Sequence, residues 1–270
     1  MNVLHGRTAL VTGASSGLGV DFATLLAERG CHLILVARRE DRLRTLADEL
    51  AAKHGVRVEV IAMSLSPLGA AQELYDRIRA RNLTVDVLIN NAGFGVYGPF
   101  TQIPWEREEE MLRLDIIALV HLTKLFVRDM VARNLGWIMQ VSSIGGYQPS
   151  PTYATYSAAK AFVLSFGEAL SYELRGTNVK VSVLSPGVTE TEFLEVAGQA
   201  RTLYQRMSMM PSRPVAEIGI DAMVRGKPSK VAGAMNAFAT WSLRFMPRRW
   251  QAAMASAAMQ MGQQPARGGS

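Results

Sequence analysis

Apolar runs with the length of β-strands alternate with amphipathic helical stretches along most of this chain, and a glycine-rich turn joins the first strand to the first helix. Arg7–Thr12 is typical of a buried strand, and Gly13-Ala14-Ser15-Ser16-Gly17-Leu18-Gly19 follows it directly. An amphipathic stretch continues to Arg29, and His32–Val36 forms the next apolar run. Since parallel strands need a long crossover between them, this order predicts a βαβ unit.

The same alternation repeats along the chain. We expect further strands at Val56–Met63, Val85–Ile89, Trp137–Val141, Val179–Leu184 and Lys230–Ala234, and further helices at Glu40–His54, Leu68–Arg81, Trp105–Arg133 and Thr152–Arg175. This pattern predicts the α/β class, with a single Rossmann-type, doubly wound parallel sheet covered by helices on both faces. The 270 residues, of which 49% are hydrophobic, suffice for one such domain, which we place at residues 1–235.

The glycine-rich turn has the chemistry of a phosphate site. Glycines let the backbone approach a pyrophosphate closely, and the N-terminus of the following helix offers N–H groups and a positive dipole. The candidate cofactor-binding residues in this turn are Gly13, Ser15, Ser16, Gly17, Leu18 and Gly19. Their spacing, G-x-x-x-G-x-G, differs from the dinucleotide fingerprint G-x-G-x-x-G. A tight turn without a ligand is the alternative.

The end of the second strand bears on which dinucleotide would bind. An acidic residue there suits the ribose 2′-hydroxyl of NAD, whereas an arginine suits the 2′-phosphate of NADP. This strand has no Asp or Glu and is followed by Arg38 and Arg39. We therefore predict NADP(H) as the cofactor, with Arg38 binding the phosphate and Arg39 as a weaker candidate. The alternative is that both arginines merely open the charged helix at Glu40–His54.

Tyr156 and Lys160 form a candidate catalytic pair. They lie four residues apart in an expected helix, so their side chains share one face. A cation beside a phenol favours phenolate and moves the phenol pKa toward the working range of a proton donor. Ser143 follows the strand at Trp137–Val141 and offers a hydroxyl to the same substrate oxygen. An ordinary surface helix is the alternative explanation for the spacing alone.

The candidate motifs share one position relative to the predicted sheet. Asn90-Asn91-Ala92-Gly93, Ser142-Ser143 and Ser185-Pro186-Gly187 all come just after expected strands, as the glycine-rich turn does. Ligands of open α/β sheets bind at the carboxyl ends of the strands. This shared location is a stronger argument for one site than any single motif.

Together these motifs resemble those of the short-chain dehydrogenase/reductase family, over roughly residues 5–235. The resemblance rests on Thr12 to Gly19, Asn90 to Gly93, Ser143, Tyr156-Ser157-Ala158-Ala159-Lys160, and Pro186-Gly187 with Thr191. It implies that Tyr156 is the general acid in carbonyl reduction and that Ser143 holds the substrate oxygen. It also implies that Lys160 binds the nicotinamide ribose and lowers the pKa of Tyr156.

The resemblance further assigns the cofactor site and the reaction. Val188 and Thr191, which follow Pro186 and Gly187, would meet the nicotinamide carboxamide. Asn91, Ala92 and Gly93 would line the adenosine side, and Arg38 with Ser15 is similar to the NADP-preferring variant of the family. The expected substrate is a small ketone, aldehyde or secondary alcohol, with a hydride passing to or from the nicotinamide.

Two positions depart from the family pattern. Asp115 stands where the family usually has an asparagine that shapes a proton relay near the lysine, so we keep it among the candidate catalytic residues. Its carboxylate would place a charge near Lys160 and affect activity. Ser64 stands where the family usually has an aspartate for the adenine amino group, and the backbone of Leu65 is expected to do that work. A dinucleotide-binding regulator or scaffold without turnover is therefore a second hypothesis.

The last third of the chain carries weaker signals. Residues 192–214 resemble the variable substrate lid of the family, and their methionines suit an apolar pocket, although a helix that only covers the core explains them equally well. Residues 236–261 form an amphipathic helical extension with apolar residues and Arg244, Arg248 and Arg249. We expect this extension to contact a sister subunit of a homo-oligomer, a dimer or tetramer, in preference to a membrane surface. Residues 262–270 are expected to be disordered.

Composition excludes several other classes. The net charge of +6 comes from scattered basic clusters rather than one block, so we expect no nucleic-acid partner. The four histidines have no metal-like spacing, and we expect no metal. Cys31 is the single cysteine, and the first residues show neither a secretion signal nor a spanning segment. These features predict a cytoplasmic protein.

Overall fold

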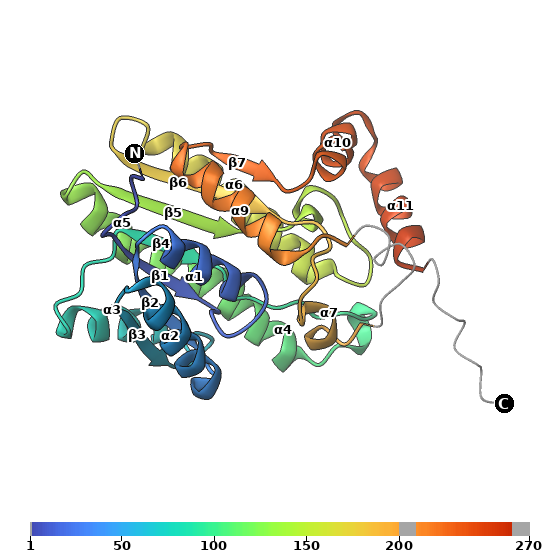
Figure 1. The fold of residues 1–270 in the computed structure, drawn as a ribbon. Coiled ribbons are helices and arrows are strands. Elements are labelled where there is room, and N and C mark those ends of the chain that lie inside the picture. Colours follow the sequence, from blue (N-terminus) through green and yellow to red (C-terminus); the bar gives the residue numbers. More distant parts are fainter. Residues whose placement is uncertain (1, 200–208, 261–270) are drawn as a thin grey trace.

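A seven-stranded parallel β-sheet forms the centre of the molecule (Figure 1). The computed structural model describes residues 2–199 and 209–260. Its strands are β1 Thr8–Thr12, β2 His32–Ala37, β3 Val58–Ala62, β4 Val87–Asn90, β5 Gly136–Val141, β6 Val179–Ser185 and β7 Ser229–Val231. Their order across the sheet is β3-β2-β1-β4-β5-β6-β7. The predicted doubly wound parallel sheet is thus confirmed, and each predicted strand overlaps an observed one.

Helices cover both faces of this sheet, as Figure 1 shows. The main ones are α1 Leu18–Glu28, α2 Glu40–His54, α3 Ala70–Ala80, α4 Trp105–Leu112, α5 Leu119–Ala132, α6 Ala154–Glu173 and α9 Ser212–Val224. Phe22 of α1 and Ile220 of α9 belong to the core on one face, whereas Leu74 of α3 and Phe126 of α5 belong to the core on the other. The strands are apolar on both sides because both sides are covered.

The segment predicted as one long helix at Trp105–Arg133 is interrupted. Between α4 and α5, the residues Arg113–Ala118 form a π-helix, η2, and Asp115 lies within it. Such wide turns occur mostly as short inserts, frequently at functional sites. The helical pattern of the sequence predicts the α-helices but not this insert, because the insert coincides with contacts that Asp115 makes to distant residues.

Within the described residues, the C-terminal third adds helical segments to the predicted sheet. α7 Phe193–Val196 lies in the expected lid, while residues 200–208 of that lid are outside the described residues. The lid was expected to reach residue 214, but α9 already begins at Ser212. The extension consists of α10 Ala234–Ser242, a short 3₁₀ helix η4 Leu243–Phe245, and α11 Arg248–Gln260. The expected disordered tail at 262–270 is outside the described residues.

α10 and α11 form one unit at the end of the molecule beyond β7 (Figure 1). The side-chain amide of Gln251 on α11 donates hydrogen bonds to the carbonyls of Leu243 at 2.8 Å and Met246 at 2.9 Å, which joins α11 to η4. Asn236 of α10 lies against Gly187, at the turn after β6. Among the helices of residues 2–199 and 209–260, none is long and apolar enough to cross a membrane.

Candidate active site

The candidate site is a pocket at the carboxyl ends of the strands, where the order of the sheet reverses between β1 and β4. Its volume is about 430 Å³. The pocket extends from the residues after β2 to the residues after β5 and β6, and α11 contributes Ala255 and Ala258 to its wall. A ligand position at such a reversal is the one that doubly wound sheets favour.

Thr12 and Asn91 tie the two diverging strands together at this edge. The Thr12 hydroxyl accepts hydrogen bonds from the backbone N–H of Asn91 and of Ala92, both at 3.0 Å, and donates one to the Ile89 carbonyl at 3.1 Å. The Asn91 amide donates to the Thr12 carbonyl at 2.9 Å. These hydrogen bonds join β1 to the residues after β4, so this part of the pocket floor is fixed.

The glycine-rich turn passes close to this floor, which explains its glycines. Gly13 and Gly17 have φ angles of 68° and 51°, a conformation that side chains disfavour. A Cβ on Gly13 would also lie 2.9 Å from the Cα of Ala92, and one on Gly17 would lie 2.8 Å from the methyl carbon of Thr191. Gly19 faces the carbonyl of Gly13 and lies behind the pocket wall. The turn therefore presents backbone to the pocket.

Ser143 and Tyr156 meet at the other end of the pocket. Ser143 precedes η3, a short 3₁₀ helix at Ile144–Tyr147, and its hydroxyl accepts a hydrogen bond from the Gly145 N–H at 3.1 Å. The hydroxyl of the neighbouring Ser142 donates to the Lys160 carbonyl at 2.7 Å, which holds η3 against α6. Tyr156 and Lys160 project from α6, and Lys160 Nζ lies 5.6 Å from the centre of the Tyr156 ring. The sequence-predicted trio is brought together.

Lys160 is held from behind by a buried acid. Its Nζ lies 2.9 Å from Asp115 Oδ2 and donates a hydrogen bond to the Val141 carbonyl at 3.2 Å. Asp115 has no exposed surface, and its other oxygen accepts a hydrogen bond from the Phe94 N–H at 3.1 Å. Asp115 does not line the pocket but lies against Gly93, where a Cβ would be 2.8 Å from Oδ1. It contacts the pocket lining from behind, through Lys160, Gly93 and Phe94.

The charges of this cluster follow from burial and from each other. Burial raises the pKa of Tyr156, while Lys160 lowers it, Asp115 raises it, and the hydrogen bond with Ser143 lowers it. Lys160 thus acts in the predicted direction, but burial and Asp115 outweigh its effect, so the pKa of Tyr156 is raised and not lowered. For Lys160, burial lowers the pKa and the charges of Asp115 and Tyr156 more than offset this, so that the pKa is raised. At neutral pH the phenol is protonated and the amine is charged.

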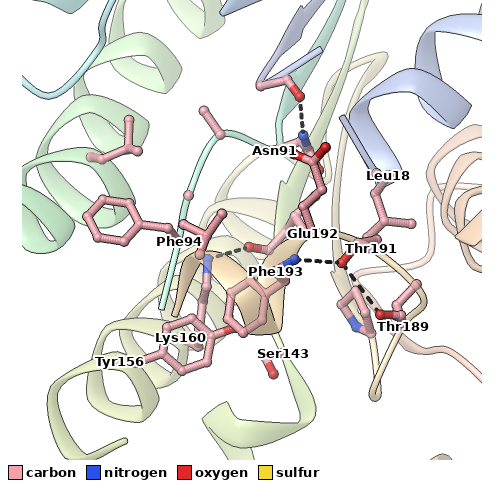
Figure 2. A pocket seen from close by; sticks show the side chains of 18 of the residues that line it. Leu18, Asn91, Phe94, Ser143, Tyr156, Lys160, Thr189, Thr191, Glu192 and Phe193 are labelled. Atoms are coloured by element: carbon pink, nitrogen blue, oxygen red, sulfur yellow. Dashed lines mark hydrogen bonds between the residues drawn. The ribbon is translucent and has the colours of Figure 1, made fainter. Parts of the chain in front are cut away.

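A short helix after β6 covers Tyr156. The ring of Phe193, at the start of α7, lies 5.3 Å from that of Tyr156, and Figure 2 shows the two rings together with Lys160 behind them. The Phe193 N–H donates to the Thr191 hydroxyl at 3.2 Å. Tyr153, at 5.6 Å from the Tyr156 ring, extends this aromatic wall. Tyr153 was not predicted as a site residue, since nothing in its spacing separates it from a core residue.

The opposite end of the pocket is charged and half-exposed. The side chain of Arg38 is 69% exposed, and its Nη1 lies 3.7 Å from Glu110. Arg39 donates from Nε to the Ser15 hydroxyl at 3.3 Å and from Nη1 to Glu192 at 2.9 Å. Arg42 donates to the other oxygen of Glu192 at 2.7 Å. Both Arg38 and Arg39 line the pocket, so either guanidinium can meet an anion there.

The predicted cofactor residues gather in this one pocket. Its lining includes Gly13, Ser15, Ser16, Gly17, Leu18, Arg38, Ser64, Leu65, Asn91, Ala92, Gly93, Ser143, Tyr156, Lys160, Pro186, Gly187, Val188 and Thr191. Gly19 and Asp115 support that lining from behind. Sequence reasoning missed Glu192 and the pocket-lining alanines of α11, because their contacts join segments far apart in the chain.

Known proteins resemble this chain over most of its length. The family model described as short chain dehydrogenase matches residues 7–202. A short chain dehydrogenase from Pseudocercospora fijiensis is 33% identical over 236 residues, which are 82% of this chain and 75% of that protein. The structure of a short-chain dehydrogenase from Sphingobium yanoikuyae in complex with NADPH is 31% identical, covers 91% of this chain and 98% of that one, and has a TM-score of 0.79.

A structure of 7beta-hydroxysteroid dehydrogenase superposes with a TM-score of 0.84 at 25% identity, covering 93% of this chain and 97% of that one. Fold, motif positions and these similarities agree. The chain belongs to the short-chain dehydrogenase/reductase family of oxidoreductases.

Proposed function

We propose that this protein is an NADP(H)-dependent oxidoreductase acting on a ketone, an aldehyde or a secondary alcohol, with Tyr156 as general acid and base. The observation that carries the proposal is one pocket with Ser143, Tyr156 and Lys160 at one end and arginines at the other. The relative from Sphingobium yanoikuyae, solved with NADPH, supports the choice of cofactor.

The residues present fit a nicotinamide dinucleotide. Gly13, Ser16 and Gly17 line the pocket where α1 begins, and the N-terminus of a helix after a glycine-rich turn suits a pyrophosphate. Arg38 would bind the 2′-phosphate, with Ser64 and Leu65 beside the adenine and Val188 with Thr191 beside the nicotinamide. The chemistry that this group supplies when bound is hydride transfer.

The chain's own residues would orient the substrate and move the proton. The Ser143 hydroxyl accepts a hydrogen bond from the Gly145 N–H and bonds with Tyr156, so it stands beside the phenol and would meet the same substrate oxygen. Tyr156, protonated at neutral pH, would donate its proton to that oxygen in reduction and accept it in oxidation. The charged Lys160 stabilises the phenolate that remains after donation.

The substrate side of the pocket is apolar. Phe94, Tyr153, Phe193 and Leu194 line it, and Ala255 and Ala258 close it. Apolar walls with a few placed polar groups are typical of sites that bind hydrophobic small molecules. We therefore propose an apolar carbonyl compound or alcohol as the substrate class.

A second candidate function is dinucleotide-dependent regulation without turnover. The observation that favours it is the ion pair of Lys160 with Asp115, because a paired lysine has less charge to offer a cofactor ribose or a phenolate. Two measurements separate the candidates: a direct titration of NADPH binding, and NADPH consumption against a panel of aliphatic, aromatic and polycyclic ketones and aldehydes. Tight binding without consumption of NADPH on any of them would favour the regulator.

The proposal includes self-association through the C-terminal unit formed by α10, η4 and α11. Met235, Phe238, Trp241 and Phe245 are exposed there, with Trp250 and Met254 on α11. The Phe238, Trp241 and Phe245 rings lie in a row, with centres 6.0 and 5.1 Å apart. Exposed aromatic rows of this kind mark interaction surfaces, and members of this family commonly form oligomers. A second copy of the chain is the partner we propose.

A further inference from the structure

Glu192 connects the lid to the arginines at the end of β2. Its carboxylate accepts a hydrogen bond from Arg39 at 2.9 Å on one oxygen and from Arg42 at 2.7 Å on the other. Arg39 also donates to the side chain and the backbone carbonyl of Ser15, in the glycine-rich turn. A carboxylate from the lid therefore sits between two guanidinium groups at the mouth of the pocket.

The proposed function assigns the 2′-phosphate to Arg38, and Arg39, the weaker candidate, lines the same pocket next to it in the chain. We infer that Glu192 is an internal competitor for that phosphate and that its displacement releases the described part of the lid, residues 192–199, from the pocket. This inference rests on the proposed NADP(H) dependence and adds the residue that links cofactor choice to access for the substrate. In the absence of a phosphate, Glu192 supplies the anion that the arginines bind.

A phosphate has the advantage in this competition. It carries up to two negative charges and three acceptor oxygens, whereas the carboxylate carries one charge and two oxygens. The ion pairs it must displace are weak, since the side chains of Arg39, Arg42 and Glu192 are 39%, 48% and 39% exposed. Hydrogen bonds from Arg42 and Arg39 lower the pKa of Glu192, so the carboxylate is charged and repels an incoming phosphate until it moves away.

The chain carries this displacement directly to the catalytic end. Phe193 follows Glu192, and its ring covers Tyr156. Close contacts tie the same segment down at Thr191, whose methyl group lies over Gly17. Residues 192 and 193 thus span the pocket, with one side chain on the arginines and the next on the tyrosine. Moving Glu192 outward moves Phe193 away from the place that a substrate carbonyl needs.

Two consequences follow for the cofactor. NADPH would both bind and open the lid, which places cofactor binding before substrate binding. NADH lacks the 2′-phosphate and would leave Glu192 on its arginines with Phe193 over Tyr156. The enzyme would then discriminate between NADPH and NADH in two ways: by its affinity for the cofactor and by the access that it gives to the substrate.

Two fragments of the cofactor test this link on the wild-type protein. Adenosine 2′,5′-bisphosphate carries the 2′-phosphate, and adenosine 5′-monophosphate does not. Within α7 and the turn after it, the amides of Val196, Ala197, Gly198 and Gln199 donate backbone hydrogen bonds, so their hydrogen–deuterium exchange reports on lid opening. We expect faster exchange of these amides with the bisphosphate and no change with the monophosphate.

Substitution of Glu192 supplies the second arm. The Glu192→Gln variant should exchange fast at these amides without any ligand and should bind the bisphosphate roughly two- to tenfold more tightly, as expected for removal of two exposed ion pairs. Its affinity for the monophosphate should stay the same. Glu195→Gln is the matched control, because Glu195 is an exposed acid on the same short helix and should behave as wild type.

The outcomes separate the two proposals. Binding of the bisphosphate with unchanged or slower exchange at residues 196–199 would overturn the role of Glu192 and leave the cofactor proposal standing. Failure of the bisphosphate to bind any better than the monophosphate, in wild type and in Glu192→Gln, would overturn both. If Glu192→Gln and Glu195→Gln show the same exchange and the same affinity for the bisphosphate, the ion pairs of Glu192 with Arg39 and Arg42 are ordinary surface contacts.

Discussion

The Tyr156 end of the pocket consists of buried groups, whereas the arginine end consists of exposed charges that find partners on three different segments. Lys160 and Asp115 are 7% and 0% exposed and lie 2.9 Å apart. Arg38 is 69% exposed, and its contact with Glu110 is as long as 3.7 Å. One end is fixed by the backbone positions of η2, β5 and α6, and the other by side chains that can exchange partners.

This difference has an energetic meaning. Removing one member of a buried ion pair costs about 3–5 kcal/mol, because the remaining charge is left without a partner. An exposed pair contributes about 0.2–1 kcal/mol. The buried end is thus suited to hold one geometry for proton transfer, and the exposed end is suited to tell two cofactors apart by small differences. Substitutions at the two ends should therefore differ in kind.

The largest effect is expected at the buried end, from Tyr156→Phe. This change removes one hydroxyl from the proton path and should lower kcat by about 10²–10⁴-fold, while NADPH binding and thermal stability remain. Tyr172→Phe is the control, since Tyr172 lies on the same helix and is 68% exposed. Steady-state kinetics with the best carbonyl substrate would measure kcat for both variants. A Tyr156→Phe enzyme with nearly normal kcat would remove the phenol from the mechanism.

At the exposed end, Arg38→Ala should weaken NADPH much more than NADH. The expected loss for NADPH is that of a charged hydrogen bond, ~1.5–3 kcal/mol, or roughly ten- to hundredfold in affinity. Arg39→Ala is the comparison, because Arg39 is already held by Ser15 and Glu192. Fluorescence titrations of both cofactors measure the losses. If Arg38→Ala loses the same affinity for NADPH as for NADH, Arg38 is only a surface charge.

At both ends of the pocket, the sequence predicts the local features and misses the long-range contacts. Strands, the glycine-rich turn and the Tyr156–Lys160 spacing follow from local patterns, so the sheet and most pocket residues could be placed in advance. The π-helix at Arg113–Ala118 could not, because it accompanies contacts of Asp115 with Lys160 and Phe94 that lie outside any local window. The Glu192 pairs with Arg39 and Arg42 join residues about 150 positions apart, and no spacing rule reaches that far.

Asp115→Asn is expected to have a smaller effect on catalysis, and it should show in the pH profile. The Asp115 charge raises the pKa of Tyr156 and offsets Lys160, so its removal lowers that pKa. Reduction needs the protonated phenol, and its rate should begin to fall at a lower pH than in wild type. Beyond that point the rate declines by roughly tenfold per pH unit. Oxidation, which needs the phenolate, should gain at neutral pH.

Rates in both directions, measured from neutral to alkaline pH, test this prediction. Asp129→Asn is the control, because Asp129 accepts a hydrogen bond from Tyr75 of α3 and neither residue lines the pocket. A reductive profile that keeps its alkaline limb, or moves it to higher pH, would show that the Asp115 charge does not reach the phenol.

The smallest effect on catalysis is expected from the C-terminal unit, which lies beside the pocket but presents its aromatic row outward. Phe245→Ser removes a side chain that is 74% exposed and should leave kcat nearly unchanged while it weakens self-association. Phe100→Ser is a matched control, because Phe100 is also in a short 3₁₀ helix and is 63% exposed. Light scattering of both variants measures the oligomer.

Salt separates the proposed second copy from a membrane surface. From Ala232 to the last residue the sequence has no Asp or Glu, and Arg244, Arg248 and Arg249 lie on the C-terminal unit. Two copies that meet through this unit bring like charges near each other, so added salt should strengthen their association by screening the repulsion. Binding to anionic vesicles would instead weaken with salt. The wild-type protein could instead bind anionic vesicles less as salt rises, lose that binding in Phe245→Ser, and stay a monomer at every salt concentration. These results would show that the partner of the C-terminal unit is a lipid surface and not a second copy of the chain. An unchanged oligomer and no vesicle binding would leave the aromatic row as local packing.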